Sequence, residues 1–490
     1  MTLSPASPEM TWVPPEILDD RLDPRPFQRS VQDPIVAVRS AGFQMVKLGA
    51  PSVTSYLNRG VGGAVDRPTA CRLFKSRSVR EGFLAADADY LPEGKANRLG
   101  KKRLVPGDVI LTSSGLGTIG RAALFLSSEL ATVDNHVSII RCRSAKLHGG
   151  YLVAFLNSRF GQAWCTWGTT GSTGQLELNR DRVAEFQIPL PARSIQTYIG
   201  VKLELAERCR SRSLALRSSA ASALTADWGW SEKLSGWQNQ PGTIAHMVEP
   251  RMFDDRLDPE FYRLGFLAVE EWLDAQECWH LSELVEPPVK GVQPSYDPDG
   301  TVPALTVTHV DPFVLDRSGA TGFVTEDWLS QNGRARIEAG ELLYTVTGPP
   351  LGETVVVEKF HLPAAVNSHV ARVRLRPEFK FRHLLAAMLN SPLGQLQTTR
   401  YSKGIRQKEL YPSDFIRFRF PKLSSEVCSR LEKKFAASCR LVEQARILVQ
   451  EAKADVEALI EGTLDVDAIL AGKLKAPTAD DIPELAEDDA

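Results

Sequence analysis

The sequence predicts a mixed α/β protein built from two tandem copies of one domain, each copy followed by a long helix. The six letters DDRLDP begin at residue 19 and again at residue 254. Further matches follow both occurrences in the same order, and a long stretch without proline follows each copy. Because self-similarity at a constant offset is the signature of repeated structure, we expect two equivalent domains.

Four further pairs of segments define the repeat. LVPGDVILTSSG (104–115) matches IEAGELLYTVTG (337–348), and VDNHV (133–137) matches VNSHV (366–370). AFLNSRFGQ (154–162) matches AMLNSPLGQ (387–395), and GQLELNRDRVAEFQIPLP (174–191) matches RQKELYPSDFIRFRFPKL (406–423). The offset stays between 232 and 235 residues from the DDRLDP opening to the last matched segment. This constancy favours duplication of a whole domain.

Short strands and short helices alternate in each copy. Apolar runs entered through a Pro-Gly-Asp or an Ala-Gly-Glu turn predict strands at 109–112 and 342–346. HVSIIRCR (136–143) and HVARVRLR (369–376) alternate in their second halves, as half-buried strands do. Short helices are expected at 151–158 and 383–391, and closing strands at 186–189 and 418–421.

A long helix is expected after each copy, at 194–226 and 424–462. The second has the 4,3 spacing of a heptad seam, formed by Leu431, Phe435, Val442, Val449, Val456 and Leu459, with Ser438 as its one polar place. The first begins a seam with Ile199 and Leu203 and then carries Arg210 and Arg217. We expect the two helices to pair as an antiparallel coiled coil; the alternative is that each packs on its own domain.

The charged residues are unevenly distributed along the chain. The last 14 residues contain six acidic residues and no basic one, and without them the net charge rises from −2 to +4. A mildly basic body permits nucleic-acid binding without demanding it. The expected organisation is a lead (1–18), a first domain (19–193), a first long helix (194–226), a linker (227–253), a second domain (254–423), a second long helix (424–462) and an acidic, disordered tail (463–490).

Composition favours a cytoplasmic protein. No apolar run approaches the roughly 20 residues that a membrane helix needs. The start, MTLSPASPEMTW, lacks the basic and apolar regions of a secretory signal. The seven cysteines include no CxxC pair, so neither a zinc site nor a disulfide framework is supported. We expect reduced thiols, no metal and no membrane association.

Motifs for catalysis are weak. Gly115, Gly117 and Gly120 match G-x-G-x-x-G after a predicted strand, with Asp134 beyond them. The second copy reads GPPLG (348–352), with prolines where a helix should begin, so we interpret both segments as strand-linking turns. His136 and His369 occupy equal positions; a catalytic role is the alternative to the structural hydrogen bonding that we expect. We therefore expect a chain without catalytic residues.

Two polar loops, 168–175 and 398–408, occupy matching positions but differ in sequence. Their side chains are of the kinds that reach base edges and phosphates, although a plain surface loop would have a similar composition. Arginines also recur at matching strand positions, where they would face either phosphates or solvent. The candidate DNA-binding residues are Thr170, Ser172, Thr173, Gln175, Arg141, Arg143, Arg400, Tyr401, Lys403, Arg406, Gln407, Arg374 and Arg376.

The order of these motifs resembles the specificity (S) subunit of Type I restriction–modification systems. The resemblance rests on the RLDP opening, the PGD…G turn, the LNS…G helix, the F.IPLP close and the long helix, all present twice within residues 19–462. It implies two target recognition domains, each reading one half of a bipartite site in double-stranded DNA. Two DNA adenine methyltransferase (modification) subunits would hold the helices, and restriction/motor subunits would join for antiviral defence.

The resemblance also implies that S-adenosylmethionine, ATP and magnesium bind only to partner subunits, so this chain is expected to hold no cofactor. Two alternatives remain open. The chain could target DNA in a methylation-only or related defence system, or it could be a protein-interaction scaffold that binds no DNA. A fused nuclease or methyltransferase is a weaker alternative, because its two halves would be unequal.

Overall fold

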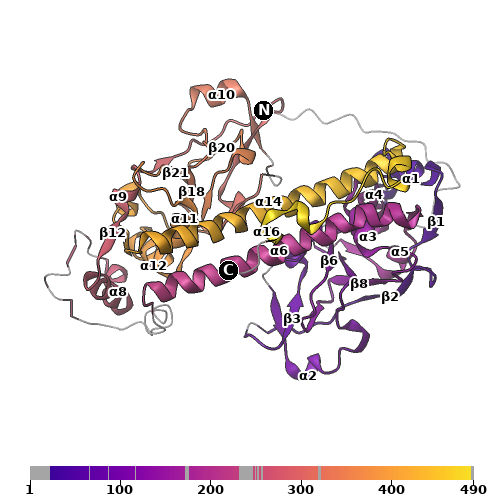
Figure 1. Cartoon of the computed structure of the whole chain (residues 1–490), viewed down its shortest axis with the longest axis horizontal. Coiled ribbons are helices and arrows are strands. Elements are labelled where there is room, and N and C mark those ends of the chain that lie inside the picture. Colours follow the sequence, from indigo (N-terminus) through magenta and orange to yellow (C-terminus); the bar gives the residue numbers. More distant parts are fainter. Residues whose placement is uncertain are drawn as a thin grey trace. The chain divides into compact units, whose positions relative to one another are not determined.

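The computed structural model describes residues 23–486, except residues 66, 86–87, 116, 172–175, 231–246, 249, 251–252, 255, 257, 318–319, 321 and 405. The chain divides into two compact units, which Figure 1 shows with the chain coloured along its sequence. The first unit comprises Met1–Arg212 and Leu441–Ala490, and the second comprises Ser213–Arg440. The lead, 1–18, lies outside the described residues.

The first unit contains short strands and short helices. Its strands are β1 (Gln44–Lys47), β2 (Thr54–Arg59), β3 (Cys71–Phe74), β4 (Asp89–Leu91), β5 (Asp108–Thr112), β6 (Ala122–Phe125), β7 (Ala131–Val133), β8 (Val137–Cys142), β9 (Thr169–Thr170), β10 (Glu177–Leu178) and β11 (Gln187–Leu190). Its short helices are α1 (Arg29–Ser40), α2 (Glu93–Ala96), α3 (Gly149–Asn157), α4 (Arg159–Gly168) and α5 (Arg180–Ala184).

The second unit is built from the same kinds of element. Its strands are β12 (Cys278–His280), β13 (Val289–Lys290), β14 (Val302–Leu305), β15 (Val310–Asp311), β16 (Val314–Leu315), β17 (Phe323–Val324), β18 (Leu342–Thr345), β19 (Thr354–Val356), β20 (Ala365–Val366), β21 (Val370–Val373) and β22 (Arg419–Pro421). Its short helices are α8 (Leu264–Asp274), α9 (Leu281–Leu284), α10 (Glu326–Gln331), α11 (Arg382–Asn390), α12 (Pro392–Tyr401) and α13 (Pro412–Phe415).

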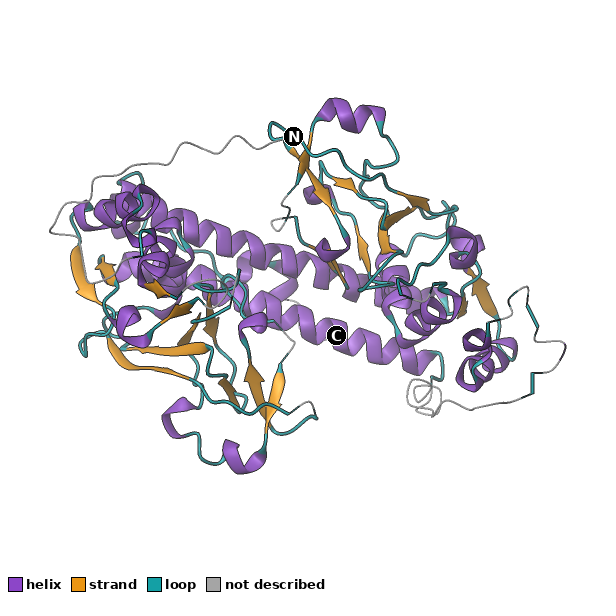
Figure 2. Ribbon diagram, turned by 180° about the vertical axis from the view of Figure 1, so that it is seen from behind, coloured by secondary structure: helices purple, strands orange, loops and turns teal. Residues whose placement is uncertain are grey.

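Three sheets of the first unit have counterparts in the second, and their strands are drawn as orange arrows in Figure 2. Among the described residues, the pairs β9-β10 and β15-β16 each occur in one unit only. The first unit has a four-stranded sheet of order β2-β8-β5-β6, a three-stranded sheet of order β4-β3-β7 and the pair β1-β11. The second has β13-β21-β18-β19, β17-β14-β20 and β12-β22. Both four-stranded sheets are antiparallel, and the parallel pairs β3-β7 and β14-β20 also correspond.

The central strands are buried on both faces instead of alternating between core and solvent. All five residues of β5 and the first four of β8 are buried. Ile110 and Ile139 belong to one apolar cluster with Phe74 and Val133 of the three-stranded sheet. Because the second sheet covers what would be the solvent face, the first four residues of β8 are buried on both faces. In the second half of 136–143, where alternation was expected, Arg141 and Cys142 are both half-buried and Arg143 is exposed.

The LNS…G segments bind the same backbone groups in both units. The Asn157 amide donates to the carbonyl of Ala122 (2.8 Å) and accepts from its N–H (2.9 Å), and Asn390 binds Thr354 in the same two ways (2.8 and 3.0 Å). The serines that follow cap the next helices: Ser158 accepts from the N–H of Gly161, and Ser391 from that of Gly394. These contacts explain why the letters recur.

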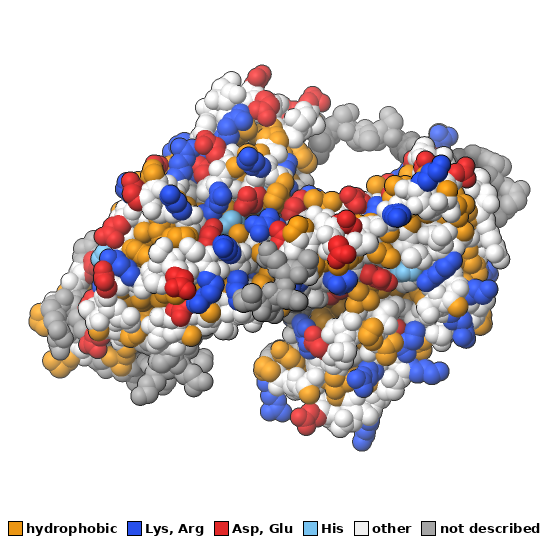
Figure 3. Space-filling model, viewed as in Figure 1, with side chains coloured by type: hydrophobic (Ala, Val, Ile, Leu, Met, Phe, Trp, Pro, Cys, Tyr) orange, Lys and Arg blue, Asp and Glu red, His pale blue; other side chains and the backbone are white. Residues whose placement is uncertain are grey.

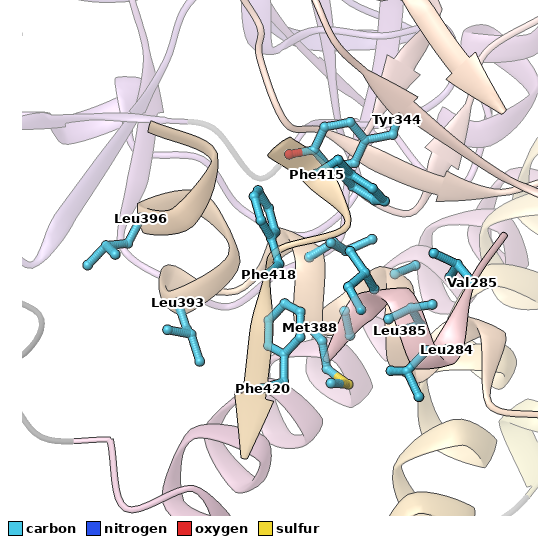
Figure 4. Packing of buried hydrophobic residues seen from close by; sticks show 14 of the residues in the cluster. Leu284, Val285, Tyr344, Leu385, Met388, Leu393, Leu396, Phe415, Phe418 and Phe420 are labelled. Carbon is cyan, nitrogen blue, oxygen red and sulfur yellow. The ribbon is translucent and has the colours of Figure 1, made fainter. Parts of the chain in front are cut away.

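Several aromatic side chains lie in the core of the second unit. Tyr344, Phe415, Phe418 and Phe420 lie in one buried cluster with Met388 and Leu385 of α11 (Figure 4). The rings of Tyr344 and Phe415 meet edge to face, with centroids 4.6 Å apart. Burying such rings supplies much of the apolar contact that holds β18, α13 and α11 together.

Two long helices, α6 (Arg193–Asp227) and α14 (Ser425–Glu461), end within two residues of the positions expected from the sequence. The predicted seam residues Ile199, Leu203, Leu431, Phe435, Val449, Val456 and Leu459 are buried, whereas Val442 is half-buried. In the first unit, Lys202 of α6 donates to Asp455 of α14 (2.7 Å). In the second unit, Ser213 of α6 and Ser438 of α14 are joined through their hydroxyls (3.0 Å).

The expectation of a disordered tail is wrong for residues 463–486. This segment forms α15 (Val466–Leu470) and α16 (Pro483–Ala486) and buries Ile469 and Ile482. Its acidic residues act as caps: Asp465 accepts from the N–H of Ala468 (2.9 Å), and Asp481 accepts from the N–H of Thr478 (2.7 Å). Carboxylates at such positions satisfy free backbone N–H groups, so acidity here accompanies order.

Candidate nucleic-acid interface

The first polar loop begins and ends on a short hairpin in the first unit. Thr170 of β9 pairs with Glu177 of β10. Arg59, the last residue of β2, forms an ion pair with the Glu177 carboxylate and donates to the carbonyl of Leu178 (3.1 Å). The base of the loop is thus fixed to the four-stranded sheet. Thr170 is half-buried, while Ser172, Thr173 and Gln175 lie outside the described residues, so their role stays a prediction.

The second polar loop is anchored in the same way. Lys403 and Glu409 exchange two backbone hydrogen bonds of 2.8 Å each. Lys290, the last residue of β13, binds the Glu409 carboxylate at 2.5 Å, as Arg59 binds Glu177 in the first unit. Arg406 and Gln407 lie exposed between these fixed ends. The Lys403 ammonium is engaged with Asp414 (2.8 Å), so Arg406 and Gln407 are the predicted residues most available to a ligand.

The expectation that Arg400 and Tyr401 are exposed loop residues is wrong. Both are only 6% exposed, at the end of α12. Arg400 forms an ion pair with Glu270 and lies over the ring of Phe261, 4.4 Å from its centroid. Tyr401 packs edge to face on the same ring. A second helix, α12, follows the one expected at 383–391 and extends to Tyr401, so these side chains join the core.

The repeated RLDP letters hold the base of this loop in the second unit. The Arg256 guanidinium donates to the carbonyls of Tyr401 (3.0 Å) and Ser402 (3.3 Å), at the end of α12. Asp258 forms an ion pair with Arg256 (2.7 Å) and caps the following turn through the N–H of Phe261. The motif therefore joins the start of the domain to the second polar loop. The counterpart Arg21 lies outside the described residues.

The strand arginines bind carboxylates of their own sheet. Arg141 donates to both oxygens of Asp108 (2.7 Å each), a side chain with no exposed surface. Arg374 donates to Glu341 at the matching position (2.7 Å), and Arg372 adds a buried pair to the same carboxylate. The hydrogen bond to Asp108 raises the pKa of Arg141, and that to Glu341 raises the pKa of Arg374.

Arg143 and Arg376 are exposed, and each donates to a backbone carbonyl, of Pro51 (2.5 Å) and Ser282 (3.1 Å) respectively. All four arginines therefore have structural partners. A contact with phosphate stays a prediction for them, and it is best placed for the three exposed side chains, those of Arg143, Arg374 and Arg376.

The paired histidines lie at strand starts. The N–H of His136 donates to the Asp134 carboxylate (2.9 Å), and that of His369 donates to the Asn367 side chain (3.1 Å). The His136 ring also meets the Ser114 hydroxyl at 2.7 Å. These contacts shape the turn before β8 and β21, in line with the structural role that we expected.

The glycine motif forms a turn between antiparallel strands. β5 pairs with β6, and Gly115, Gly117 and Gly120 all have positive φ angles. Such angles suit a tight link and not the start of a helix, where a dinucleotide pyrophosphate would bind. Among the residues that the structure describes, no group of three His, Cys, Asp or Glu side chains could hold a metal ion, and no helix is long and apolar enough to cross a membrane.

Sequence reasoning missed Arg59 and Lys290. Each lies more than a hundred residues from its glutamate, at 118 and 119 residues, so no local pattern connects them. Glu177 and Glu409 occupy the same position in the aligned segments. This repeated acidic residue is the signal that could have indicated a basic partner for each.

The chain is similar to several solved structures, three of which come from Type I restriction–modification systems. No family model and no curated protein matches the chain. The S subunit of a Type I restriction–modification system from M. genitalium is 12% identical with a TM-score of 0.38, over 86% of this chain and 96% of that one. The HsdS subunit from Thermoanaerobacter tengcongensis is 15% identical with a TM-score of 0.28, over 86% and 97%.

The third structure comes from work on complex assembly and conformational transition of the type I R-M system. It is 16% identical with a TM-score of 0.28, over 86% of this chain and 98% of that one. Because all three TM-scores are below 0.5, we base the proposal below on this chain's own residues and contacts.

Proposed function

We propose that this chain is the specificity subunit of a Type I-like restriction–modification complex. In this proposal, two tandem target recognition domains each read one half of a bipartite site in double-stranded DNA. The chain itself is non-catalytic and directs partner adenine methyltransferase and motor-nuclease subunits, which bind S-adenosylmethionine, ATP and magnesium. The order of the sequence motifs resembles that of proteins with this function.

The observation that carries the proposal is a repeated scaffold with different loop tips. The ion pairs of Arg59 with Glu177 and of Lys290 with Glu409 fix the two loops at equivalent places. Between the ends of each loop the sequences differ at most positions: the first tip is rich in Ser, Thr and Gly, the second contains Arg406, and only Gln175 and Gln407 match. A constant frame with variable polar tips suits two readers of different base sequences.

The long helices supply a candidate surface for partner subunits. We propose that they pair as an antiparallel coiled coil. Two contacts support this antiparallel pairing. One joins a residue early in α6 to a residue late in α14, and the other joins a residue late in α6 to a residue early in α14. In the first unit Lys202 binds Asp455 (2.7 Å), and in the second unit Asp227 binds Arg430 (3.2 Å).

Two experiments test the proposal. Methylation sequencing of the host with and without this gene should reveal an adenine-methylated bipartite motif that disappears on deletion. An electrophoretic mobility shift of the purified chain on random duplex DNA at low salt, alone and with the neighbouring methyltransferase, should show binding. An unchanged methylation pattern together with no DNA binding would favour the protein-interaction scaffold.

A further inference from the structure

We propose that segment 93–103 of the first unit, EGKANRLGKKR, anchors the phosphate backbone of double-stranded DNA without reading its sequence. This inference rests on the proposed function, because it assumes a DNA duplex beside the recognition loops. The segment comprises α2, the turn after it and a 3₁₀ turn, Gly100–Lys102. It lies between β4 and β5, and no motif discussed above includes it.

The segment concentrates positive charge on the surface. It has five basic residues and a single acidic one: Lys95, Arg98, Lys101, Lys102 and Arg103 against Glu93. Lys102 is half-buried and the other four are exposed. Figure 3, in the view of Figure 1, shows blue side chains gathered at the end of the first unit where α2 lies.

Within the described part of the chain, these five side chains have no carboxylate partner, unlike their neighbours. Among the described residues, none of the five forms an ion pair. On the adjacent strand and turn, by contrast, Arg72 binds Glu129 (3.2 Å) and Arg77 binds Asp89 (2.7 Å). Like charges held close together without counter-charges repel one another, and a polyanion relieves that repulsion.

The segment is held in place. The ammonium of Lys95 donates to the carbonyl of Gly62 (3.1 Å), and that of Lys102 donates to the carbonyl of Gly60 (2.8 Å). Leu99 is buried in a small apolar cluster with Cys71 and Leu91. A fixed backbone presents the remaining cations, Arg98, Lys101 and Arg103, at a lower entropic cost than a free loop would.

The segment also lies close to the base of the first polar loop. Gly60 approaches the backbone of Val133 so closely that an added Cβ would lie 1.8 Å from the Val133 carbonyl oxygen. The N–H of Val61 donates to that same carbonyl (2.9 Å). Residue 133 directly precedes the turn of Asp134 and His136, and Arg59, one residue before Gly60, binds the base of the first loop. One duplex could therefore contact both the loop and the cations.

The matching segment of the second unit lacks this property. Residues 326–336, EDWLSQNGRAR, contain two acidic and two basic residues. Arg336 forms an ion pair with Glu326 (2.9 Å). The two domains thus share a scaffold but not this charge, so the anchor is specific to the first one.

The test compares two triple variants of the full-length protein. The patch variant is Arg98→Gln/Lys101→Gln/Arg103→Gln. The matched control, Lys146→Gln/Arg208→Gln/Lys473→Gln, removes the same charge from exposed first-unit residues that form no ion pair among the described residues. Binding to a random-sequence duplex and to a duplex containing the methylated motif is measured by fluorescence anisotropy at several salt concentrations.

The patch variant should bind both duplexes more weakly by the same factor, and the magnitude of its salt slope should fall by about 0.9 for each lost phosphate contact, up to about 2.7. The control should keep the wild-type slope. A conservative variant, Arg98→Lys/Arg103→Lys, should retain binding, which separates lost charge from lost folding.

Equal slopes for patch and control variants would overturn the anchor while leaving the proposed function intact. Loss of preference for the motif would show base reading instead. Wild-type protein that binds neither duplex would overturn the proposed function itself.

Discussion

The guanidinium of Arg141 donates two hydrogen bonds of 2.7 Å to the fully buried carboxylate of Asp108. Asp108 also accepts from the N–H of Val105 (2.9 Å), three residues earlier. Arg374, Glu341 and the N–H of Glu338 repeat this arrangement in the second unit. The pair therefore ties β8 to the turn that enters β5. It explains why both an acidic residue in the turn and an arginine in the later strand recur.

Replacing Asp108 by Asn should destabilise the protein strongly. The substitution leaves Arg141 without its counter-charge next to a buried site, and breaking such a pair costs about 3 kcal/mol. The free energy of unfolding from urea titration gives the measurement. Arg143→Gln is the matched control, because this exposed arginine donates only to a backbone carbonyl. Equal stability of the two variants would show that Asp108 and Arg141 do not support the fold.

The polar place in the seam of α14 should matter for stability as well. Ser438 accepts from Arg217 Nε (2.6 Å) and meets the Ser213 hydroxyl (3.0 Å), both on α6. Ser438→Ala removes the acceptor of a half-buried guanidinium, so the unfolding free energy should fall by about 1–3 kcal/mol. Ser429→Ala, at an exposed position of the same helix, should have little effect. If both substitutions behave alike in urea titration, the hydrogen bonds do not stabilise this pair of helices.

The strands and helices that were expected from local patterns are present, because the periodicity of a strand or helix depends on residues that are neighbours in the sequence. The helix expected at 194–226 is Arg193–Asp227, and the turn Pro-Gly-Asp does enter β5. Helix α12, which was not predicted, and the burial of its last residues were missed for the opposite reason. Arg400 is buried because Glu270, 130 residues earlier, lies beside it, and no local pattern reports a partner at that distance.

The candidate site was predictable only in part. Divergent loops at matching positions marked where recognition could occur, and Arg406 and Gln407 are exposed there. The strand arginines were expected on a phosphate-facing or solvated surface, yet Arg141 and Arg374 bind carboxylates. Composition alone cannot distinguish an arginine that binds DNA from one that holds a turn, because both roles require the same forked donor.

The second unit should lose stability as the pH rises. His383 lies between Glu432 (2.8 Å) and Glu358 (3.0 Å). Burial alone would lower the pKa of His383, but hydrogen bonds to both carboxylates outweigh it and raise the pKa above 6.5. The stabilisation by the charged imidazole is complete below about pH 6.5 and is lost as the pH rises through the folded-state pKa. The stability difference between wild type and His383→Gln, measured by urea titration between about pH 6 and pH 9, should therefore shrink with increasing pH.

His148 of the first unit should respond in the opposite direction. Burial, aided by Arg193, lowers the pKa of His148 to about 4. A neutral imidazole is thus favoured in the fold, and its contribution is present above about pH 6.5 and is lost as the pH falls through about 4. The stability difference between wild type and His148→Gln should shrink on acidification. If the stability differences of the His383→Gln and His148→Gln variants from wild type changed with pH in the same direction, the opposite pKa shifts of the two histidines would be contradicted.

Removing the Arg406 side chain should alter recognition in one half-site only. Arg406 is exposed in the loop whose ends are fixed by Glu409 and Asp414. If its guanidinium binds a guanine with two hydrogen bonds, Arg406→Ala should weaken binding to the cognate duplex by roughly 1–3 kcal/mol and relax specificity in the second half-site. Because the first domain is unchanged, the other half-site should be read as before. Methylation sequencing of cells that carry the variant gives the answer, with Arg382→Ala, an exposed arginine at the start of α11, as the control. A bipartite motif that is unchanged in both halves would exclude this loop as a reader of bases.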